Sequence, residues 1–276
     1  MNNIENQIKS HIEDITQPLW IPRLTLLLVD NQWEQFKKVG VSKSNYSSDK
    51  ILSGTDHSKT PFNYLSFSNI DISEIPKVLE DRSSNSPGYI DSEFTNSSAP
   101  ECVQEALSNL LQIPSISNTV NLLVANMHLL KPHDNGYDVS YSLPELPFSI
   151  FVSVPTQRVN FDALRVAESI LHEAMHLQLS LIDKVVPLLE NTYDKEYFSP
   201  WRNEFRHPIG VLHGLYVFRV IQLYLRKLTL TGSANLYRIE RIADIEKQIS
   251  QVIEFKDFEG LTATGHVLTE RIFKNS

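Results

Sequence analysis

The chain has 276 residues, a length that fits one large domain or two small ones. Its net charge is −8, from 25 basic and 33 acidic residues without a dense lysine or arginine cluster, so no nucleic-acid partner is expected. The single cysteine, Cys102, excludes an intrachain disulfide and fits a reducing compartment. The start lacks the apolar core of a signal peptide, and the apolar runs at 24–29 and 120–130 are too short or interrupted to cross a bilayer. We therefore expect a cytoplasmic protein that does not span a membrane.

The N-terminal part divides into short helices and loops. Apolar residues at helical spacing predict helices at about 3–14, 23–38 and 100–112, the last with Cys102 as a packed thiol. Segments 42–59 and 80–100 are rich in Ser, Asn, Asp and Gly and are expected to be loops. Residues 1–115 carry no recognisable signature, and from position alone we assign them a possible role in substrate recognition.

The C-terminal part, 116–276, begins with β structure and continues with helices. A strand or strand pair is predicted within 117–130, a turn with an Asn-Gly dipeptide within 131–138, and a β-rich segment at 147–155. The helical pattern that follows predicts four helices, at about 160–189 with a break near Pro187, 207–230, 233–256 and 261–273. This order predicts an α+β fold, predominantly helical, with a small antiparallel sheet packed on a helical bundle.

The stretch "ESILHEAMHLQLS" at 168–180 carries the clearest chemical pattern of the chain. On a helix, His172 and His176 share one face and can present two imidazoles to one ion, with Glu173 beside the first. Apolar residues surround these three groups, and burying them without partners would cost several kcal/mol. A metal site on a zincin-like bundle is therefore predicted, with 116–276 as its metal-binding catalytic region.

The third ligand is expected on the next long helix. A metzincin continuation would need glycine at 179 and histidine at 182, where this chain has Leu179 and Ile182. A glutamate ligand is also missing, because the helix at 208–228 contains no acidic residue. It contains His213, flanked by Gly210 and Gly214, whose lack of side chains permits close approach to the backbone. His213 is thus the predicted third ligand, and the metal itself is left open.

Two arginines precede this helix in "SPWRNEFRHPIG". Arg202 and Arg206 lie four positions apart, with Trp201 beside the first. Guanidinium groups bind carboxylates as two-pronged donors, so the pair is placed to hold an anionic ligand near the metal. The alternative is that Glu204, between them, only balances their charge.

Together, "LHEAMH" and "WRNEFRHPIGVLHGLYVF" resemble the HExxH-motif peptide-modification proteins of ribosomally synthesised peptide pathways. The resemblance covers roughly 116–235. The family pattern has a Trp-Arg pair, an Arg-Pro pair, a glycine and a His-Gly pair, onto which fall Trp201, Arg202, Arg206, Gly210, His213 and Gly214. His207 stands where the family has proline, with Pro208 one place later.

The resemblance implies an activity, because the family includes iron- and 2-oxoglutarate-dependent enzymes that hydroxylate the β-carbon of a residue in a precursor peptide. It implies Fe(II) on the three histidines and a precursor peptide as partner. It also implies a 2-oxoglutarate carboxylate on Arg206 or Arg202. Glu173 would be an outer group that orients a ligand or a substrate amide.

Two other functions use the same residues. A zinc metallopeptidase would employ Glu173 as general base and hold its peptide along an edge strand such as 149–155. A peptidase more typically supplies a glutamate as third ligand and needs no pair of arginines, so the oxygenase is favoured. The second alternative is a non-catalytic, metal-stabilised protein that binds a peptide.

Four aromatic or imidazole side chains near the predicted turn are weaker candidates. Tyr137 and Tyr141 would lie on a hairpin before the HExxH helix and could line the cleft. Such residues more often belong to the core, and the same holds for His128 and His133.

Overall fold

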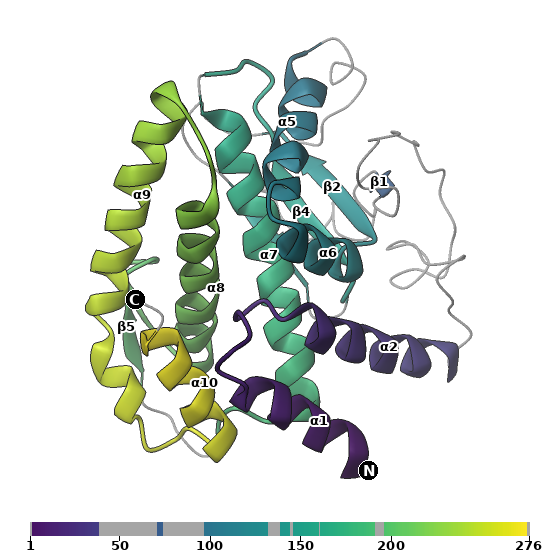
Figure 1. Cartoon of the computed structure of the whole chain (residues 1–276), viewed down its shortest axis with the longest axis vertical. Helices are drawn as coiled ribbons and strands as arrows, with labels where there is room; N and C mark the ends of the chain where they lie inside the picture. The colour runs from purple at the N-terminus through teal and green to yellow at the C-terminus, as the bar shows by residue number, and fades with distance from the viewer. Residues whose placement is uncertain are drawn as a thin grey trace. The chain divides into compact units, whose positions relative to one another are not determined.

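The computed structural model describes residues 2–38, 71–73, 97–131, 139–143, 146–159, 161–190 and 196–274. Over these residues the chain is mostly helical with a small sheet, which confirms the predicted α+β class (Figure 1). The predicted loop at 42–59, most of the one at 80–100 and the predicted turn lie outside the described residues, as do His133 and Tyr137.

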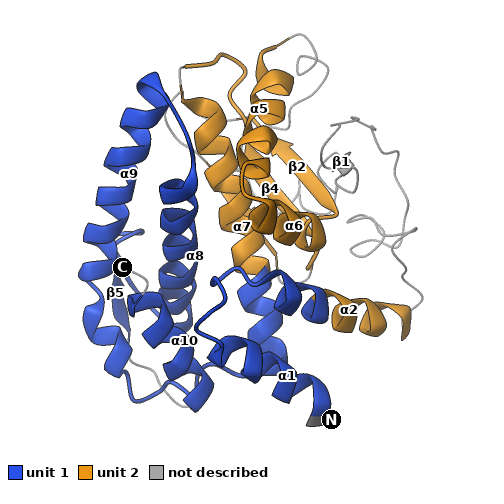
Figure 2. Cartoon of the chain, in the orientation of Figure 1, with its two compact units in different colours: residues 1–28, 178–276 blue, residues 29–177 orange. Residues whose placement is uncertain are grey.

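The chain forms two compact units (Figure 2). Unit 1 combines Met1–Leu28 with Gln178–Ser276, and unit 2 is Val29–Leu177. The boundaries fall within helix α2 (Pro22–Lys38) and helix α7 (Asp162–Val185), both predicted from the sequence. The division of the chain into 1–115 and 116–276 by expected role remains a prediction.

Unit 2 contains a four-stranded sheet with the order β1-β2-β4-β3. Strands β1 (Asp71–Ser73), β2 (Asn126–Leu130) and β4 (Ser149–Ser153) are parallel, and β3 (Ser140–Ser142) pairs antiparallel with β4. The sheet is therefore mixed, and the prediction of an antiparallel sheet is wrong for its centre. All five residues of both central strands are buried, as is usual for parallel strands covered on both faces.

The segment before β2 was predicted incorrectly. Residues Pro114–Leu123 form helix α6, so the strand prediction holds only for the second half of 117–130. Ile116, Val120 and Leu123 are fully buried at a spacing of three and four residues, which is the helical period. The preceding helix α5 (Ala99–Leu111) agrees with prediction, and its Cys102 is buried, as expected for a packed thiol.

Unit 1 is mainly helical. It contains α1 (Asn2–Glu13), α8 (Pro208–Lys227), α9 (Gly232–Ser250) and α10 (Ala263–Lys274), all close to the predicted bounds. The predicted helix at 233–256 is divided, because Ile253–Asp257 forms a separate 3₁₀ turn. A hairpin of β5 (Tyr197–Ser199) and β6 (Glu204–Arg206) was not predicted.

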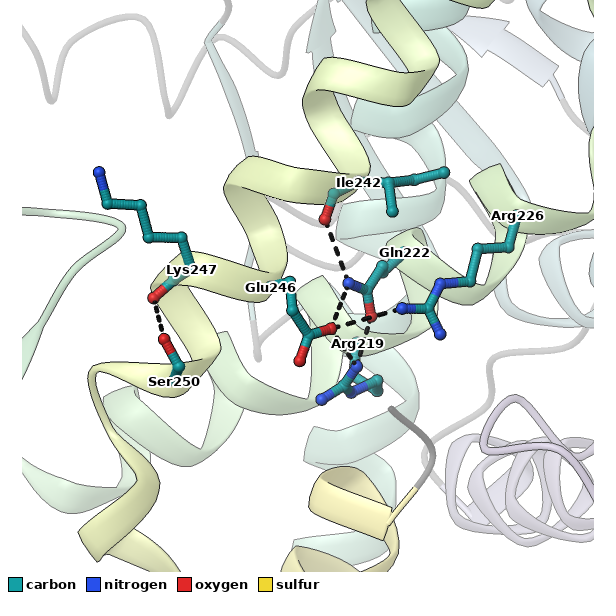
Figure 3. Close-up of polar contacts among 7 residues, drawn as sticks. All are labelled: Arg219, Gln222, Arg226, Ile242, Glu246, Lys247 and Ser250. Atoms are coloured by element: carbon teal, nitrogen blue, oxygen red, sulfur yellow. Dashed lines mark hydrogen bonds and ion pairs between the residues drawn. The ribbon is translucent and has the colours of Figure 1, made fainter.

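Helices α8 and α9 are joined by a polar network (Figure 3). Arg219 of α8 is 1% exposed and lies 3.1 Å from Glu246 of α9, while its neighbour Gln222 accepts a second hydrogen bond from it. Gln222 donates to Glu246 Oε2 at 2.6 Å and to the Ile242 carbonyl at 3.2 Å, and Arg226 is 3.5 Å from the same carboxylate. Burial opposes ionisation of Glu246, yet the hydrogen bonds and the two arginines lower its pKa below the ordinary value.

The length and hydropathy of α8 would allow it to cross a membrane, and it is the one such helix among the described residues. Of the stretch of α8 that meets these criteria, 67% is buried inside the protein. The core helix of a globular protein meets the same criteria, so the predicted absence of a spanning segment stays a prediction.

Within unit 1, the residue before α10 is hydrogen-bonded to the segment that follows α7. Thr262 donates through its amide to the Leu188 carbonyl at 3.0 Å and through its hydroxyl to the Pro187 carbonyl at 2.8 Å. At Gly265, a Cβ atom would lie 2.1 Å from the Leu188 carbonyl oxygen. Only glycine therefore fits at this position.

Candidate functional site

The two histidines of the HExxH motif lie together on α7 in unit 2. The Nε2 atoms of His172 and His176 are 3.0 Å apart, and the ring centroids are 4.6 Å apart at an interplanar angle of 67°. Two imidazole nitrogens that share one zinc ion at about 2.0–2.1 Å are separated by about 3 Å in a tetrahedral or tighter arrangement. The spacing is that of a hydrogen bond between the two rings, and it also fits a shared ion.

Glu173 is buried beside this pair. It is 2% exposed, and its Oε1 lies 3.8 Å from Nε2 of His172. The hydroxyl of Ser140, in strand β3, donates a 2.7 Å hydrogen bond to the same oxygen. Sequence reasoning missed Ser140, because it lies 33 positions from Glu173 and no local pattern connects the two.

The strand next to this site is β3 rather than β4. Within the described part of the sheet, β3 pairs on one side only, with β4, whereas β4 lies between β2 and β3. The prediction of 149–155 as an edge strand for peptide binding is therefore wrong. The described edge near Glu173 is Ser140–Ser142.

His128 and Tyr141 belong to an aromatic stack across three strands. Phe151 of β4 stacks on His128 of β2 at 4.4 Å and 18°, and on Tyr141 of β3 at 4.4 Å and 10°. His128 is 1% exposed, and partial burial raises the pKa of Tyr141. Both residues therefore pack in the core of the sheet, which is the more common role expected from the sequence for such side chains.

In unit 1, His213 lies in the second turn of α8. Burial and, to a smaller extent, the positive charge of Arg206 lower the pKa of His213 to about 4. The imidazole is therefore neutral at neutral pH, which is the form that binds a metal ion.

The β5–β6 hairpin carries Trp201 and Arg206 onto the first half of α8. Its four-residue connection closes through the Ser199 carbonyl, which accepts from the amides of Arg202 and Asn203, the latter with a φ of 55°. This left-handed conformation suits asparagine better than most residues. Trp201 stacks on Phe218 of α8 with centroids 5.2 Å apart and planes 5° apart.

This hairpin explains the glycine at 214 and lies against the one at 210. A Cβ atom at Gly214 would lie 2.6 Å from Cε3 of Trp201, closer than any carbon contact allows. A Cβ atom at Gly210 would meet Cζ and Nε of Arg206 at 3.4 Å, which is an ordinary contact. The predicted close approach is thus real, and the groups that approach are an indole and a guanidinium.

The two arginines differ in their surroundings. Arg206 lies 3.5 Å from Glu204, and both side chains are substantially exposed, so the expected charge balance by Glu204 is present. Arg206 also acts on His213 through its charge. Arg202 is exposed in the hairpin connection. Arg206 is therefore the arginine that is coupled to a predicted ligand.

The predicted site residues thus form two groups. His172, His176 and Glu173 lie together in unit 2, and His213 lies near Arg206 in unit 1. Among the residues that the structure describes, no set of three or more His, Cys, Asp and Glu side chains has an arrangement that could hold a metal ion. The three-histidine ligand set therefore remains a prediction.

No protein-family model matches the chain, and a search of curated proteins gives no match.

Proposed function

We propose that this protein is an iron- and 2-oxoglutarate-dependent oxygenase that hydroxylates the β-carbon of a residue in a precursor peptide. The observation that carries the proposal is the pair of His172 and His176, with Nε2 atoms 3.0 Å apart beside a buried glutamate. We assign His213 as the third ligand, with the HExxH helix in a zincin-like arrangement.

The donor set fits iron as well as zinc. Three imidazoles would leave coordination positions open, and 2-oxoglutarate would bind there through its keto-acid end. When bound, iron with this co-substrate supplies the oxidation of an unactivated C–H bond. The chain itself holds the ion, positions the peptide and excludes water.

Arg206 is assigned to the far carboxylate of 2-oxoglutarate. Its guanidinium lies along the first turn of α8, against Gly210, and its charge acts on His213. A guanidinium offers two parallel N–H donors to a carboxylate. A partner of this kind favours a dicarboxylate co-substrate, which a peptidase does not need.

Glu173 is assigned an orienting role. Its carboxylate is buried and held by the Ser140 hydroxyl, so it is fixed in direction next to the histidine pair. From that position it can accept a hydrogen bond from a substrate amide or hold a ligand in place. Ser140 thus supports Glu173 from the neighbouring strand.

A zinc metallopeptidase is the second candidate, favoured by the same strand. β3 runs antiparallel to β4 and pairs on one described side only, and a peptide could add to such an edge. Glu173 would then be the general base. A non-catalytic metal-stabilised peptide-binding protein remains the third outcome of the tests below.

The test is an anaerobic titration of metal-free protein with iron(II) and 2-oxoglutarate, followed by oxygen and a succinate assay. A visible charge-transfer band and formation of succinate are expected for the wild type. The band should vanish in His213→Ala and persist in His207→Asn, which keeps a side-chain acceptor for the Ile209 amide at the start of α8.

A different result separates the alternatives. Tight zinc binding without band or succinate rejects the oxygenase. Peptide cleavage that disappears in Glu173→Gln then identifies a peptidase. Peptide binding without any turnover identifies the non-catalytic protein.

A further inference from the structure

The hairpin β5–β6 is attached to α8 by a steric fit around Trp201. The six-membered ring of the indole occupies the space that a side chain at Gly214 would fill, with Cε3 and Cζ3 at 2.6 and 2.7 Å from the position of a Cβ atom. The opposite partner is Phe218, one turn further along the helix, which stacks on the indole. The ring is therefore held between a glycine and an aromatic face of one helix.

Packing rather than hydrogen bonding holds this ring. Within the described residues, the buried Nε1 of Trp201 has no hydrogen-bond partner. An unsatisfied buried N–H costs about 1–3 kcal/mol, so contacts of the ring must offset this cost. The orientation of Trp201 therefore depends on the fit with Gly214 and Phe218.

The same hairpin places Arg206. Tyr197 pairs with Arg206 and Ser199 with Glu204, so the two strands form one ribbon. Arg206 is the last residue of β6, and its guanidinium lies against Gly210, one helical turn before Gly214. Two contacts on one face of α8 therefore fix the ribbon, and the indole makes the closer one.

We infer that Trp201 is the positioning residue for Arg206, because its fit against Gly214 sets where the guanidinium lies and thereby the recognition of the far carboxylate of a dicarboxylate keto acid. This inference rests on the proposed function. Trp201 does not touch the keto acid. It acts through Arg206, by holding the ribbon to α8.

The experiment compares two keto acids that differ only at the far end. 2-Oxoglutarate carries the second carboxylate, and 2-oxovalerate has the same keto-acid head and the same five-carbon chain without it. Affinity for each is measured by the charge-transfer band of the iron(II) protein without oxygen, in the wild type, Trp201→Ala, Gly214→Ala and Gly210→Ala. Iron(II) affinity is measured for every variant.

Trp201→Ala and Gly214→Ala should bind 2-oxoglutarate about tenfold more weakly, the scale for a displaced charged hydrogen bond. Their affinities for 2-oxovalerate and iron(II) should not change. Gly210→Ala is the comparison: its Cβ would make only an ordinary contact with the Arg206 side chain, so its loss of 2-oxoglutarate affinity should be smaller than that of Gly214→Ala.

Two further variants test rescue. Trp201→Phe keeps an aromatic ring between Gly214 and Phe218 and loses an N–H that has no described partner, so it should retain most of the affinity. The double variant Trp201→Phe with Gly214→Ala should recover part of what Gly214→Ala loses, because a smaller ring leaves space for the methyl group.

Two results would overturn the inference. One is an equal loss of affinity for both keto acids, which indicates damage to the metal site. The other is an unchanged affinity for 2-oxoglutarate in Trp201→Ala and Gly214→Ala. Failure of the wild type to bind either acid is a different result: it rejects the proposed function, and the inference falls with it.

Discussion

The hydroxyl of Ser140 and the carboxylate of Glu173 form a 2.7 Å hydrogen bond that joins strand β3 to helix α7. The bond matters because Glu173 is 2% exposed, and a buried carboxylate needs donors. It connects the described edge of the sheet with the HExxH motif inside one compact unit.

Replacing Ser140 by alanine should therefore destabilise the protein by about 1–3 kcal/mol, the range for removing one hydrogen-bond partner of a buried polar group. Urea unfolding at neutral pH measures the change. Ser142→Ala, in the same strand, is the control and should have a smaller effect. Equal stability of the Ser140→Ala and wild-type proteins would show that the bond contributes nothing.

His176→Ala should weaken binding of iron(II) or zinc at least as much as loss of an outer-shell partner does, about 10–100-fold. The reason is that His176 and His172 present their Nε2 atoms to the same point, and a single histidine cannot chelate. Competition with a coloured chelator measures the affinity. An unchanged affinity in both single variants would place the metal elsewhere or exclude it.

Gly265→Ala should be strongly destabilising, by about 3 kcal/mol or more, because the methyl group would meet a backbone oxygen at 2.1 Å and neither element can yield without breaking hydrogen bonds. Gly232→Ala is a matched comparison. Gly232 has a φ of 60° with no atom near its Cβ position, so only backbone strain of about 1 kcal/mol applies. Thermal unfolding of both variants should give this order, and the reverse order would contradict the packing of α10.

Glu246→Gln should lower the stability by about 1 kcal/mol at neutral pH, a modest value because Glu246 is 41% exposed although Arg219 is buried. The pKa of Glu246 is lowered in the folded state, so ionisation stabilises the fold above the ordinary carboxyl pKa. This contribution is lost as the pH falls through the lowered pKa. The difference between wild type and variant should therefore shrink below about pH 4.

The control for this effect is Glu240→Gln, an exposed glutamate on the same helix. Urea unfolding at neutral pH should show a smaller loss of stability there than in Glu246→Gln. A Glu246→Gln difference that persists unchanged into acid would rule out the ionic origin.

Long helices were the predictable part of this fold. The apolar spacing along α7 and α8 extends over many turns, so their bounds were recovered to within a few residues. The hairpin was missed because each of its strands has three residues, too few for an alternating pattern. Helix α6 was mistaken for a strand because Thr119 and Val120 are β-branched, and packing overrode that preference.

The candidate site was predictable where its residues are neighbours in sequence. The i, i+4 rule places His172 above His176, and the structure has them in contact. The bond from Ser140 to Glu173 and the fit of Trp201 against Gly214 depend on chain segments that meet only after folding. The direction of β2 relative to β4 was unreadable for the same reason, since it depends on the path of the chain between them.

Unit 1 is built from two separate stretches of the chain, and this affects how the chain folds as it leaves the ribosome. Helix α1 packs on α10, and Arg271 donates to the carbonyl of Ile12 at 2.6 Å over a separation of 259 residues. Residues 29–177 are synthesised as one continuous stretch and can close early, because domains generally form as their residues emerge. Helix α1, which carries the buried Ile8 and Ile12, can pack on α10 only after that helix has been translated. Until then these apolar side chains are open to aggregation.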